Sequence, residues 1–449
     1  MELSRLLGDF IHTTSFSRLP DEVVEFTKLC VLDYLGSALA GAKEKPVQII
    51  DRYVKEMGGE PHSTLFTGGK SSVANAALVN GAAGHVLELD DIHKGSIIHA
   101  GTVVIPAALA IAEAKQSSGE ELITAIAIGY DVCYRIGEAV SPSHYYYWHN
   151  TATCGTFGAA AAACKLLELE EEGIVHALGS AGTQAAGLWE FIEDGAMSKQ
   201  LHTAKAAMNG VISAYLAEKG FTAARKILEG RRGFFEAMSD SYDPEKVTTG
   251  LGEHFKIIEN SFKIHASCRH THPAIDLMIE IKNNTNVDLE KIGKITVKAY
   301  QSAIDITNNP APETVYAAKF SMQFCAALAL IQGDASLNQF NETMLRDETI
   351  CRLMERIEVI IDPDIDQQYP EKWGTEVTIQ LKTGDVIVKS AEYPKGDPEN
   401  PVTAKDLIDK FNTLTYFLPQ EKRASLVEGV MNLEKVSDIR DLMKHVTGN

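Results

Sequence analysis

Residues 88–99 carry an unusual density of acid–base groups: three carboxylates, two histidines, a lysine and a serine in twelve positions. Charged groups are buried only when they are paired and hydrogen-bonded, so this cluster forms either a solvated surface turn or the wall of a polar site. Small residues at 81–84 and an apolar run at 102–112 flank the cluster and are typical of packed helices. These neighbours favour a functional site.

An aromatic segment with the sequence His-Tyr-Tyr-Tyr-Trp-His occupies residues 144–149, just before a stretch rich in Gly and Ala. Exposure of so many adjacent rings to water would be costly, so we expect this segment to be buried. It either lines a site that includes His149 or packs at an interdomain or subunit contact.

A third cluster, residues 197–205, begins a predicted helix. His202 and Lys205 are three positions apart and therefore share a helix face. The N-terminus of a helix presents unpaired N–H groups and the positive end of its dipole, so Lys199 beside it makes an anion site. The alternative is a solvated basic first turn.

Residues 262–273 combine cations with potential metal ligands, which are His265, Cys268, His270 and His272. The segment lacks the paired second half of a structural zinc site, so we expect no metal here. Lys263 and Arg269 instead suit the binding of a carboxylate, since the planar fork of an arginine meets a carboxylate through two hydrogen bonds.

Helices must position most of these groups, because apolar residues recur at helical spacing from residue 3 to about 260. Pro20 and Asp21 supply start signals for one helix, and Ser118 with Glu121 forms a possible capping box for another. Small side chains let helix backbones approach closely in three further helical segments, 155–163, 177–187 and 204–214.

The pattern changes after residue 260. Four segments have strand character, 292–300, 359–361, 375–381 and 386–388, and the last two flank a hairpin signal. Helical patterns lie between them at about 272–283 and 318–332, and the chain is helical again after Thr403. We therefore predict a mainly α protein with an all-helical large domain (1–262 and 400–449) and a smaller α+β lid domain (263–399).

The composition excludes several classes of function. A chain of 449 residues with 45% hydrophobic and 23% charged residues is typical of a soluble globular protein. The net charge of −19 and the absence of a basic run argue against a nucleic acid partner. No apolar run is long enough to span a membrane and no signal region is evident, so we expect no membrane partner and a cytoplasmic location. The seven cysteines lack C-x-x-C spacing, which predicts buried thiols.

The motifs together resemble the MmgE/PrpD family, which includes 2-methylcitrate dehydratases, cis-aconitate decarboxylases and an iminodisuccinate epimerase. The resemblance covers nearly the whole chain and rests on residues 32–41, 90–91 with His99, 153–160, 199–202, 262–263, 268–272 and 319–321. It implies a helical domain completed by C-terminal helices, a smaller lid domain, a pocket between the two, a homodimer and no cofactor.

The resemblance also implies site residues. The implied catalytic residues are His99, His149, Lys199 and Lys263, and the implied substrate-binding residues are Glu88, Asp91, His202, Arg269, His270 and Phe324. The chain departs from the decarboxylase pattern at Glu88 (Asp in that pattern), Ile92 (Thr) and Phe324 (Tyr), and it has one extra residue before His99. These changes alter proton-handling groups and leave the cations in place.

Residues and resemblance agree on a cofactor-independent enzyme that acts on a small di- or tricarboxylate. Fixed cations stabilise the charge that develops when a proton leaves a carbon next to a carboxylate, and histidine serves as acid or base near neutral pH. A lyase of the 2-methylcitrate dehydratase or cis-aconitate decarboxylase type is favoured. A dicarboxylate epimerase is the alternative, because Ile92 and Phe324 lack two hydroxyls of the decarboxylase pattern, and a non-catalytic binding protein on the same fold is a third possibility.

Overall fold

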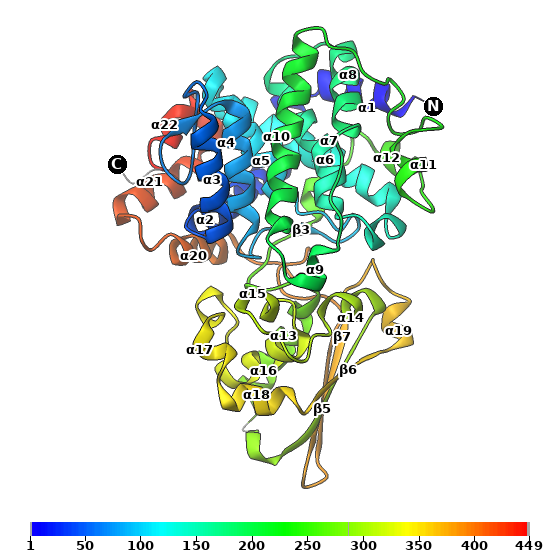
Figure 1. Cartoon of the computed structure of the whole chain (residues 1–449), viewed down its shortest axis with the longest axis vertical. Helices are drawn as coiled ribbons and strands as arrows, with labels where there is room; N and C mark the ends of the chain where they lie inside the picture. Colours follow the sequence, from blue (N-terminus) through cyan, green and yellow to red (C-terminus); the bar gives the residue numbers. More distant parts are fainter. Residues whose placement is uncertain (1, 286, 447–449) are drawn as a thin grey trace. The chain divides into compact units, whose positions relative to one another are not determined.

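The computed structural model describes residues 2–285 and 287–446, and the chain divides into two compact units. Unit 1 contains the chain up to Val86, Asp90–Asn260 and the chain from Thr403, whereas unit 2 contains Leu87–Leu89 and Ser261–Val402. Unit 1 is helical apart from very short strands, and unit 2 combines helices with a four-stranded sheet (Figure 1). The predicted fold class is therefore confirmed. No sequence signal indicated that Leu87–Leu89 would belong to unit 2.

Long helices form the core of unit 1. They are α2 (Asp21–Gly41), α4 (Val73–His85), α5 (Gly101–Lys115), α6 (Gly119–Val140), α7 (Asn150–Leu166) and α10 (Ser198–Glu218). Helix α10 packs against both α4 and α7 (Figure 1). Small residues allow close crossings: a Cβ atom at Gly158 of α7 would lie only 2.6 Å from the carbonyl oxygen of Gly129 in α6. Only glycine permits that approach of two backbones.

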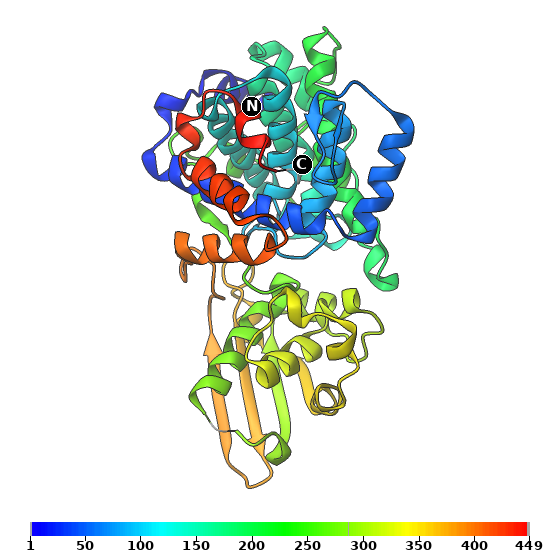
Figure 2. The same ribbon diagram turned by 90° about the vertical axis from the view of Figure 1, so that its left-hand side faces the viewer.

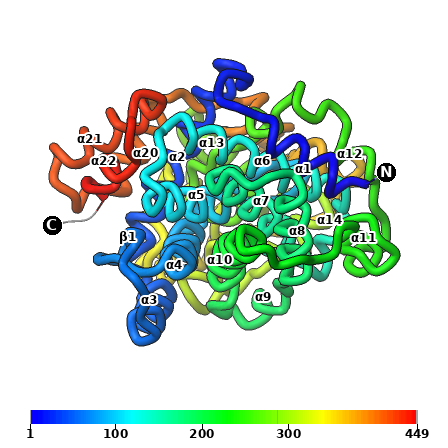
Figure 3. Tube along the Cα trace, turned by 90° about the horizontal axis from the view of Figure 1, so that it is seen from above, coloured from blue at the N-terminus to red at the C-terminus, as the bar shows by residue number. Residues whose placement is uncertain are grey.

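Shorter helices surround this core. They are α1 (Leu3–Thr13), α3 (Lys45–Met57), α8 (Glu171–Gly182) and, at the C-terminal end, α20 (Ala404–Leu414), α21 (Gln420–Met431) and α22 (Ile439–Met443). Helices α20 and α21 pack on α2, and α22 packs on α5, so the last segment of the chain lies beside early helices (Figure 3). The C-terminal segment thus completes the helical unit.

The helix boundaries follow local signals in one case and not in another. The capping box of α6 is confirmed, since Ser118 Oγ accepts the N–H of Glu121 at 3.3 Å and the Glu121 carboxylate accepts the N–H of Ser118 at 2.7 Å. The predicted helix over 177–187 is wrong beyond Gly182, where α8 ends. Gly187, the last residue of the predicted helix, has a φ of 157°, and its carbonyl oxygen accepts the N–H of His149 at 2.9 Å. A continuing helix would not allow this conformation.

The sheet of unit 2 contains β5 (Ile292–Ala299), β6 (Ile357–Ile361), β7 (Thr375–Leu381) and β8 (Val386–Ala391), in the order β6-β5-β7-β8. Strands β5 and β6 run parallel, with Val297 opposite Val359. Strand β7 is antiparallel to both β5 and β8. All four predicted strands and the predicted hairpin are confirmed.

Helices α13 (His272–Asn284) and α16 (Met322–Gln332) lie on one face of this sheet (Figure 2). The buried strand residues on that side alternate, as the period of two requires, and they are Ile295, Val297, Val377 and Ile379. On the opposite face Lys298 pairs with Glu376 across neighbouring strands at 2.8 Å. The core of unit 2 therefore lies between the sheet and these two helices.

Among the described helices, none combines the length and the apolar character needed to cross a lipid bilayer. All seven cysteines carry free thiols. Six are buried as predicted, whereas Cys351 is exposed on the short helix α18 (Glu348–Met354), so the prediction is wrong for that residue.

Candidate active site

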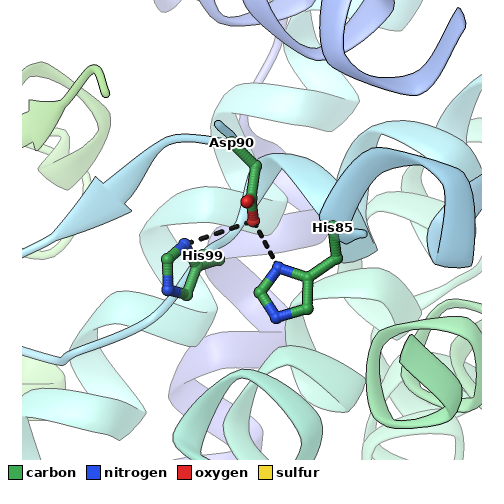
Figure 4. A group of neighbouring side chains, drawn as sticks. All are labelled: His85, Asp90 and His99. Carbon is green, nitrogen blue, oxygen red and sulfur yellow. Dashed lines mark hydrogen bonds and ion pairs between the residues drawn. The ribbon is translucent and has the colours of Figure 1, made fainter. Parts of the chain in front are cut away.

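The charged loop after α4 places one carboxylate between two imidazoles in unit 1. Asp90 Oδ2 lies 2.6 Å from Nδ1 of His85 and 3.2 Å from Nδ1 of His99 (Figure 4). All three residues are buried, and His99 is the most exposed at 8%. Burial alone would raise the pKa of Asp90, but the charges of the two histidines outweigh it and hold this pKa well below its usual value. Asp90 is therefore an ionised acceptor for both rings.

His99, just before α5, is oriented from its Nδ1 side. Besides Asp90, this atom contacts the backbone oxygen of Asp91 at 2.7 Å. A carbonyl and a carboxylate only accept hydrogen bonds, so Nδ1 carries the hydrogen. Nε2, on the opposite side of the ring, is then the atom that takes or gives a proton.

The Asp91 carboxylate is surrounded by internal donors. It accepts the backbone N–H of Gly101 at 3.0 Å, the Tyr130 hydroxyl at 2.7 Å and the Asn260 amide at 2.8 Å. Burial raises the pKa of Asp91 to about 7, although the Tyr130 and Asn260 bonds act against this shift. These contacts favour a role in ordering the loop before α5, and substrate binding by Asp91 stays a prediction.

His149, just before α7, is enclosed by rings. Its Nδ1 lies 3.2 Å from Nδ1 of His202, and its ring centroid lies 5.6 Å from that of His85 and 5.0 Å from that of Trp189. Burial, followed by the charge of His202, lowers the pKa of His149 well below its usual value. His149 is therefore a neutral imidazole near pH 7, which is the form that accepts a proton.

The first turns of α10 bring Lys199 and His202 to the same region. Lys199 is only 3% exposed, and its charge contributes to the lowered pKa values of both His149 and His202. Burial is the main cause for His202, whose pKa falls to about 4. A buried cation at a helix N-terminus provides positive potential, whereas Lys205, further along the helix, is exposed.

Within unit 2, Glu88 and Lys263 form a buried ion pair. Lys263 Nζ lies 3.5 Å from Glu88 Oε2 and donates to the backbone oxygen of Glu88 at 3.1 Å. The Tyr316 hydroxyl donates to Glu88 Oε1 at 3.3 Å, and Lys319 Nζ donates to the Leu87 oxygen at 2.8 Å. Glu88 has a φ of 60°, which is unusual for a residue other than glycine. The contacts from two lysines and a tyrosine stabilise this conformation.

Arg269 has structural partners in unit 2. Its guanidinium donates to the Lys395 oxygen at 3.1 Å, contacts Nδ1 of His272 at 3.0 Å and pairs with the Asp397 carboxylate. Its Nε is buried and has no hydrogen-bond partner among the described residues. These contacts favour a role in holding unit 2 together, and carboxylate binding by Arg269 stays a prediction.

The other two predicted binding residues of unit 2 lie among aromatic side chains. His270 contacts the Tyr300 hydroxyl through Nδ1 at 2.6 Å and stacks on Trp373 with a centroid separation of 4.5 Å. Phe324 is 1% exposed in α16 and packs against Phe340. Both residues have the surroundings of core side chains, and their role in substrate binding stays a prediction.

Two groups among the described residues have the side chains and the spacing of a metal site. One is His85, Asp90 and His99, and the other is His93, Glu138 and Glu259. In the first group, hydrogen bonds account for both short contacts. In the second, Lys256 Nζ lies 3.1 Å from each carboxylate and already supplies one positive charge to the pair. The segment 265–272 is in neither group, since His265 pairs with Asp276 and His270 with Tyr300.

The aromatic segment divides between core and solvent. His144 and His149 are buried, but Tyr146 and Tyr147 are 74% and 63% exposed. The prediction that the whole segment is buried is therefore wrong for these two residues. Tyr146 ends a short 3₁₀ turn (Ser143–Tyr146), and the chain then pairs with residues near Trp189, so only part of the segment faces the protein.

From the sequence we assigned no role to His85 or Trp189, and we included Asp90 only as part of the 88–99 cluster and the 90–91 motif, without a role of its own. His85 ends a helix rich in alanine and glycine, where a lone histidine has the pattern of a core residue. The spacing of five residues between His85 and Asp90 was the available signal, because a helix end followed by a short loop can bring such residues together. Trp189 follows the segment 177–187, which we predicted as helical, and it belongs to no motif.

Comparison with known proteins matches the sequence of this chain to one family. Residues 5–247 match the MmgE/PrpD N-terminal domain and residues 265–435 match the MmgE/PrpD C-terminal domain. The cis-aconitate decarboxylase-like protein oryM of Aspergillus oryzae is 27% identical, over 96% of this chain and 94% of its own length. The cis-aconitate decarboxylases of Aspergillus terreus and Homo sapiens are 27% and 25% identical, each over 95% of this chain and over 92% and 91% of their own lengths.

Proposed function

The chain belongs to the MmgE/PrpD family, and on that premise we propose that it is a cofactor-independent lyase acting on a small di- or tricarboxylate. The relatives are named as decarboxylases, which supports a decarboxylase or dehydratase type of reaction. One observation carries the proposal. His149 is a buried, neutral imidazole whose neighbours include the buried cation Lys199.

In the proposed chemistry, His149 and Lys199 act together at one carboxylate of the substrate. Lys199 attracts a carboxylate, and the low dielectric of a buried site strengthens that attraction. Neutral His149 then takes a proton from the carbon next to the carboxylate. The negative charge that develops is stabilised by Lys199, which acts where the charge appears and so lowers the barrier.

His99 supplies the second proton transfer through Nε2. In a dehydratase, the C–H proton goes to His149, the C–O bond breaks, and His99 protonates the departing hydroxide to give water. In a decarboxylase, the C–C bond breaks, carbon dioxide leaves, and an acid protonates the carbon that it left. The dehydration therefore needs one base and one acid on fixed side chains, whereas the decarboxylation needs one acid to protonate the carbon.

An epimerase is the second candidate. Ile92 and Phe324 are buried side chains without hydroxyls at two positions where the decarboxylase pattern has them. An epimerase exchanges one proton on opposite faces of the same carbon, so His149 and His99 would each serve as base in one direction.

The test is incubation of the purified protein with 2-methylcitrate, cis-aconitate and iminodisuccinate in deuterated water, followed by NMR. A lyase eliminates water or releases carbon dioxide from one of the compounds, and the product of a decarboxylation incorporates deuterium. An epimerase interconverts stereoisomers and exchanges one C–H for C–D. Binding without conversion or exchange of any of the three would contradict the proposal and favour a binding protein.

Cofactor independence has its own test. Hydrogen bonds within the group His85, Asp90 and His99 already use Oδ2 of Asp90 and Nδ1 of both histidines, which are three of its potential metal ligands. Dialysis against a chelator should therefore leave turnover unchanged. Loss of activity that returns on adding one divalent cation would contradict this part of the proposal. We also propose a homodimer, as the family resemblance implies, and sedimentation velocity checks it.

A further inference from the structure

His85 and Asp90 have no role in the chemistry proposed so far, yet both are buried beside a proposed catalytic residue. His85 is 0% exposed and Asp90 is 1% exposed. Nδ1 of His85 and Nδ1 of His99 meet at the same carboxylate oxygen, Oδ2 of Asp90, as Figure 4 shows. The contact with His85 is the shorter one, 2.6 Å against 3.2 Å.

We propose that His85 and Asp90 are positioning residues behind His99: the Nδ1–H of His85 fixes the Asp90 carboxylate, and the carboxylate fixes the Nδ1–H tautomer of His99. Nε2 of His99 is thereby the atom that exchanges protons with substrate. This inference rests on the proposed function for its kinetic consequence, but its structural part can be tested without any substrate.

The arrangement of acceptors supports a fixed tautomer. Nδ1 of His99 contacts a carboxylate oxygen of Asp90 and a backbone oxygen of Asp91, and neither can donate while Asp90 is ionised. A protonated Asp90 would be able to donate to Nδ1 and would then compete with the Asp91 carbonyl, which requires Nδ1–H. The charge of Asp90 therefore supports the same tautomer as the carbonyl at 2.7 Å.

His85 is the residue that keeps Asp90 charged and in place. The other carboxylate oxygen, Oδ1, is buried and has no hydrogen-bond partner among the described residues. The carboxylate is consequently held through Oδ2 alone, and the shortest bond to that atom comes from His85. Without this donor, Asp90 loses a charge-assisted hydrogen bond and becomes free to rotate or to take up a proton.

The Nε2 atom of His85 is also buried without a hydrogen-bond partner among the described residues. Such an unpaired buried group is uncommon and calls for a reason. Ring packing provides one: the imidazole of His85 stacks at 5.6 Å on that of His149 and meets that of His99 edge-on at 5.0 Å. His85 thus contacts both proposed catalytic rings, and its Nδ1 is directed to the carboxylate.

The structural test is NMR of protein labelled with ¹⁵N-histidine, in which protonated and unprotonated ring nitrogens have distinct shifts. The His99 signals are assigned by their loss in His99→Gln. We expect the Nδ1–H tautomer at His99 in the wild type and its loss or mixing in Asp90→Asn, whose amide can donate. An Nε2–H tautomer at His99 in the wild type, or a tautomer unaffected by Asp90→Asn, would overturn the proposal whatever the reaction is.

The kinetic test uses whichever substrate the panel identifies. Asp90→Asn should lower kcat by up to about 10⁴-fold, the loss seen when the carboxylate of a Ser-His-Asp triad becomes an amide. His85→Leu should lower kcat roughly tenfold to hundredfold with little change in KM. This is the range found for residues that hydrogen-bond to a metal-binding side chain and orient it. His85→Asn, which keeps a donor near the Nδ1 position, should recover much of the loss.

Controls separate positioning from folding. His176→Gln alters a histidine of α8 outside the cluster and should leave both kcat and the His99 signals unchanged. Thermal unfolding of each variant shows whether it is folded at the assay temperature. If His85→Leu is folded and has wild-type kcat, or if it raises KM alone, the assigned role is wrong. If no substrate is found, the proposed function fails while the NMR result still decides the tautomer.

Discussion

Nδ1 of His149 lies 3.2 Å from Nδ1 of His202. Two nitrogens at this distance share one hydrogen, so one ring donates and the other accepts. Both rings cannot be cations at once, because two protonated Nδ1 atoms would then face each other. The shared hydrogen bond therefore links the protonation of a proposed base to that of a neighbour on α10.

This pair should make the protein sensitive to acid. The His202 pKa is about 4 in the folded protein, against an ordinary value of 6.5, and the His149 pKa is lowered as well. The unfolded chain thus binds more protons between about pH 6.5 and pH 4, and the free energy of unfolding falls as the pH drops through that window. The stabilising contribution is complete above about pH 6.5.

Urea unfolding at pH 7.5, 6 and 5 measures this slope. His202→Gln should flatten it, and replacement of the exposed His62 by Gln should not. An equally steep slope in His202→Gln would mean that other groups cause the loss of stability in acid.

His149→Gln should preserve the fold and lower turnover by roughly two to four orders of magnitude, the usual contribution of one positioned acid–base group. Exchange of substrate hydrogen with deuterated solvent should fall in parallel if His149 removes the proton. Circular dichroism and the matched variant His176→Gln control for unfolding. Near-normal turnover in folded His149→Gln would assign the base to another residue, with His99 the next candidate.

Lys263→Met should destabilise the protein, because it removes the cation that lies 3.5 Å from the buried Glu88 carboxylate. Breaking a buried pair on one side costs about 3–5 kcal/mol. The double variant Lys263→Met/Glu88→Gln should recover most of this loss, since it removes the unpaired charge. If Lys263 also binds substrate, as the resemblance implies, KM in the single variant rises at least as much as kcat falls. A single variant as stable as the wild type would show that the pair contributes little to folding.

Gly101→Ala tests the anchoring of Asp91. A Cβ atom there would lie 2.8 Å from Asp91 Oδ1 and 2.8 Å from the Tyr130 hydroxyl, so both groups must move. We expect a loss of about 1–3 kcal/mol in the free energy of unfolding and reduced turnover, because the loop that carries Asp91 also orients His99. Gly173→Ala in α8, where the nearest atom would be 3.7 Å away, should instead stabilise slightly. Equal effects of the two variants would contradict a specific role for Gly101.

Periodicity predicted most of the fold. The four strands and the capped start of α6 follow from patterns of a few neighbouring residues, for which local physics is sufficient. The end of α8 could not be predicted from local patterns, because the side chains of residues 183–187 are compatible with a helix. A backbone hydrogen bond from His149, which is distant in sequence, holds Gly187 in a non-helical conformation. The segment Leu87–Leu89, which belongs to unit 2, likewise has hydrogen bonds from lysines more than 170 positions away.

The site was predictable in its residue types and less so in its contacts. Clusters that lie far apart in the sequence supplied His149, Lys199 and His202, which the structure brings together. The sequence did not reveal which charged side chains are already satisfied internally. Asp91 illustrates this, since its three donors come from separate segments of unit 1. Residue type indicates what a group can do, and only packing determines whether it is available.

The edge-on contact between His149 and Trp189, with centroids 5.0 Å apart, gives the candidate site an intrinsic optical reporter. An imidazolium ring quenches the emission of an indole in contact with it, whereas a neutral imidazole quenches much less. The chain has only three tryptophans, so the signal of one of them is a large share of the total. Because Trp373 stacks on His270 and Trp148 on His144, the difference in fluorescence between the wild type and Trp189→Phe follows the charge of the proposed base, with no added label and no turnover.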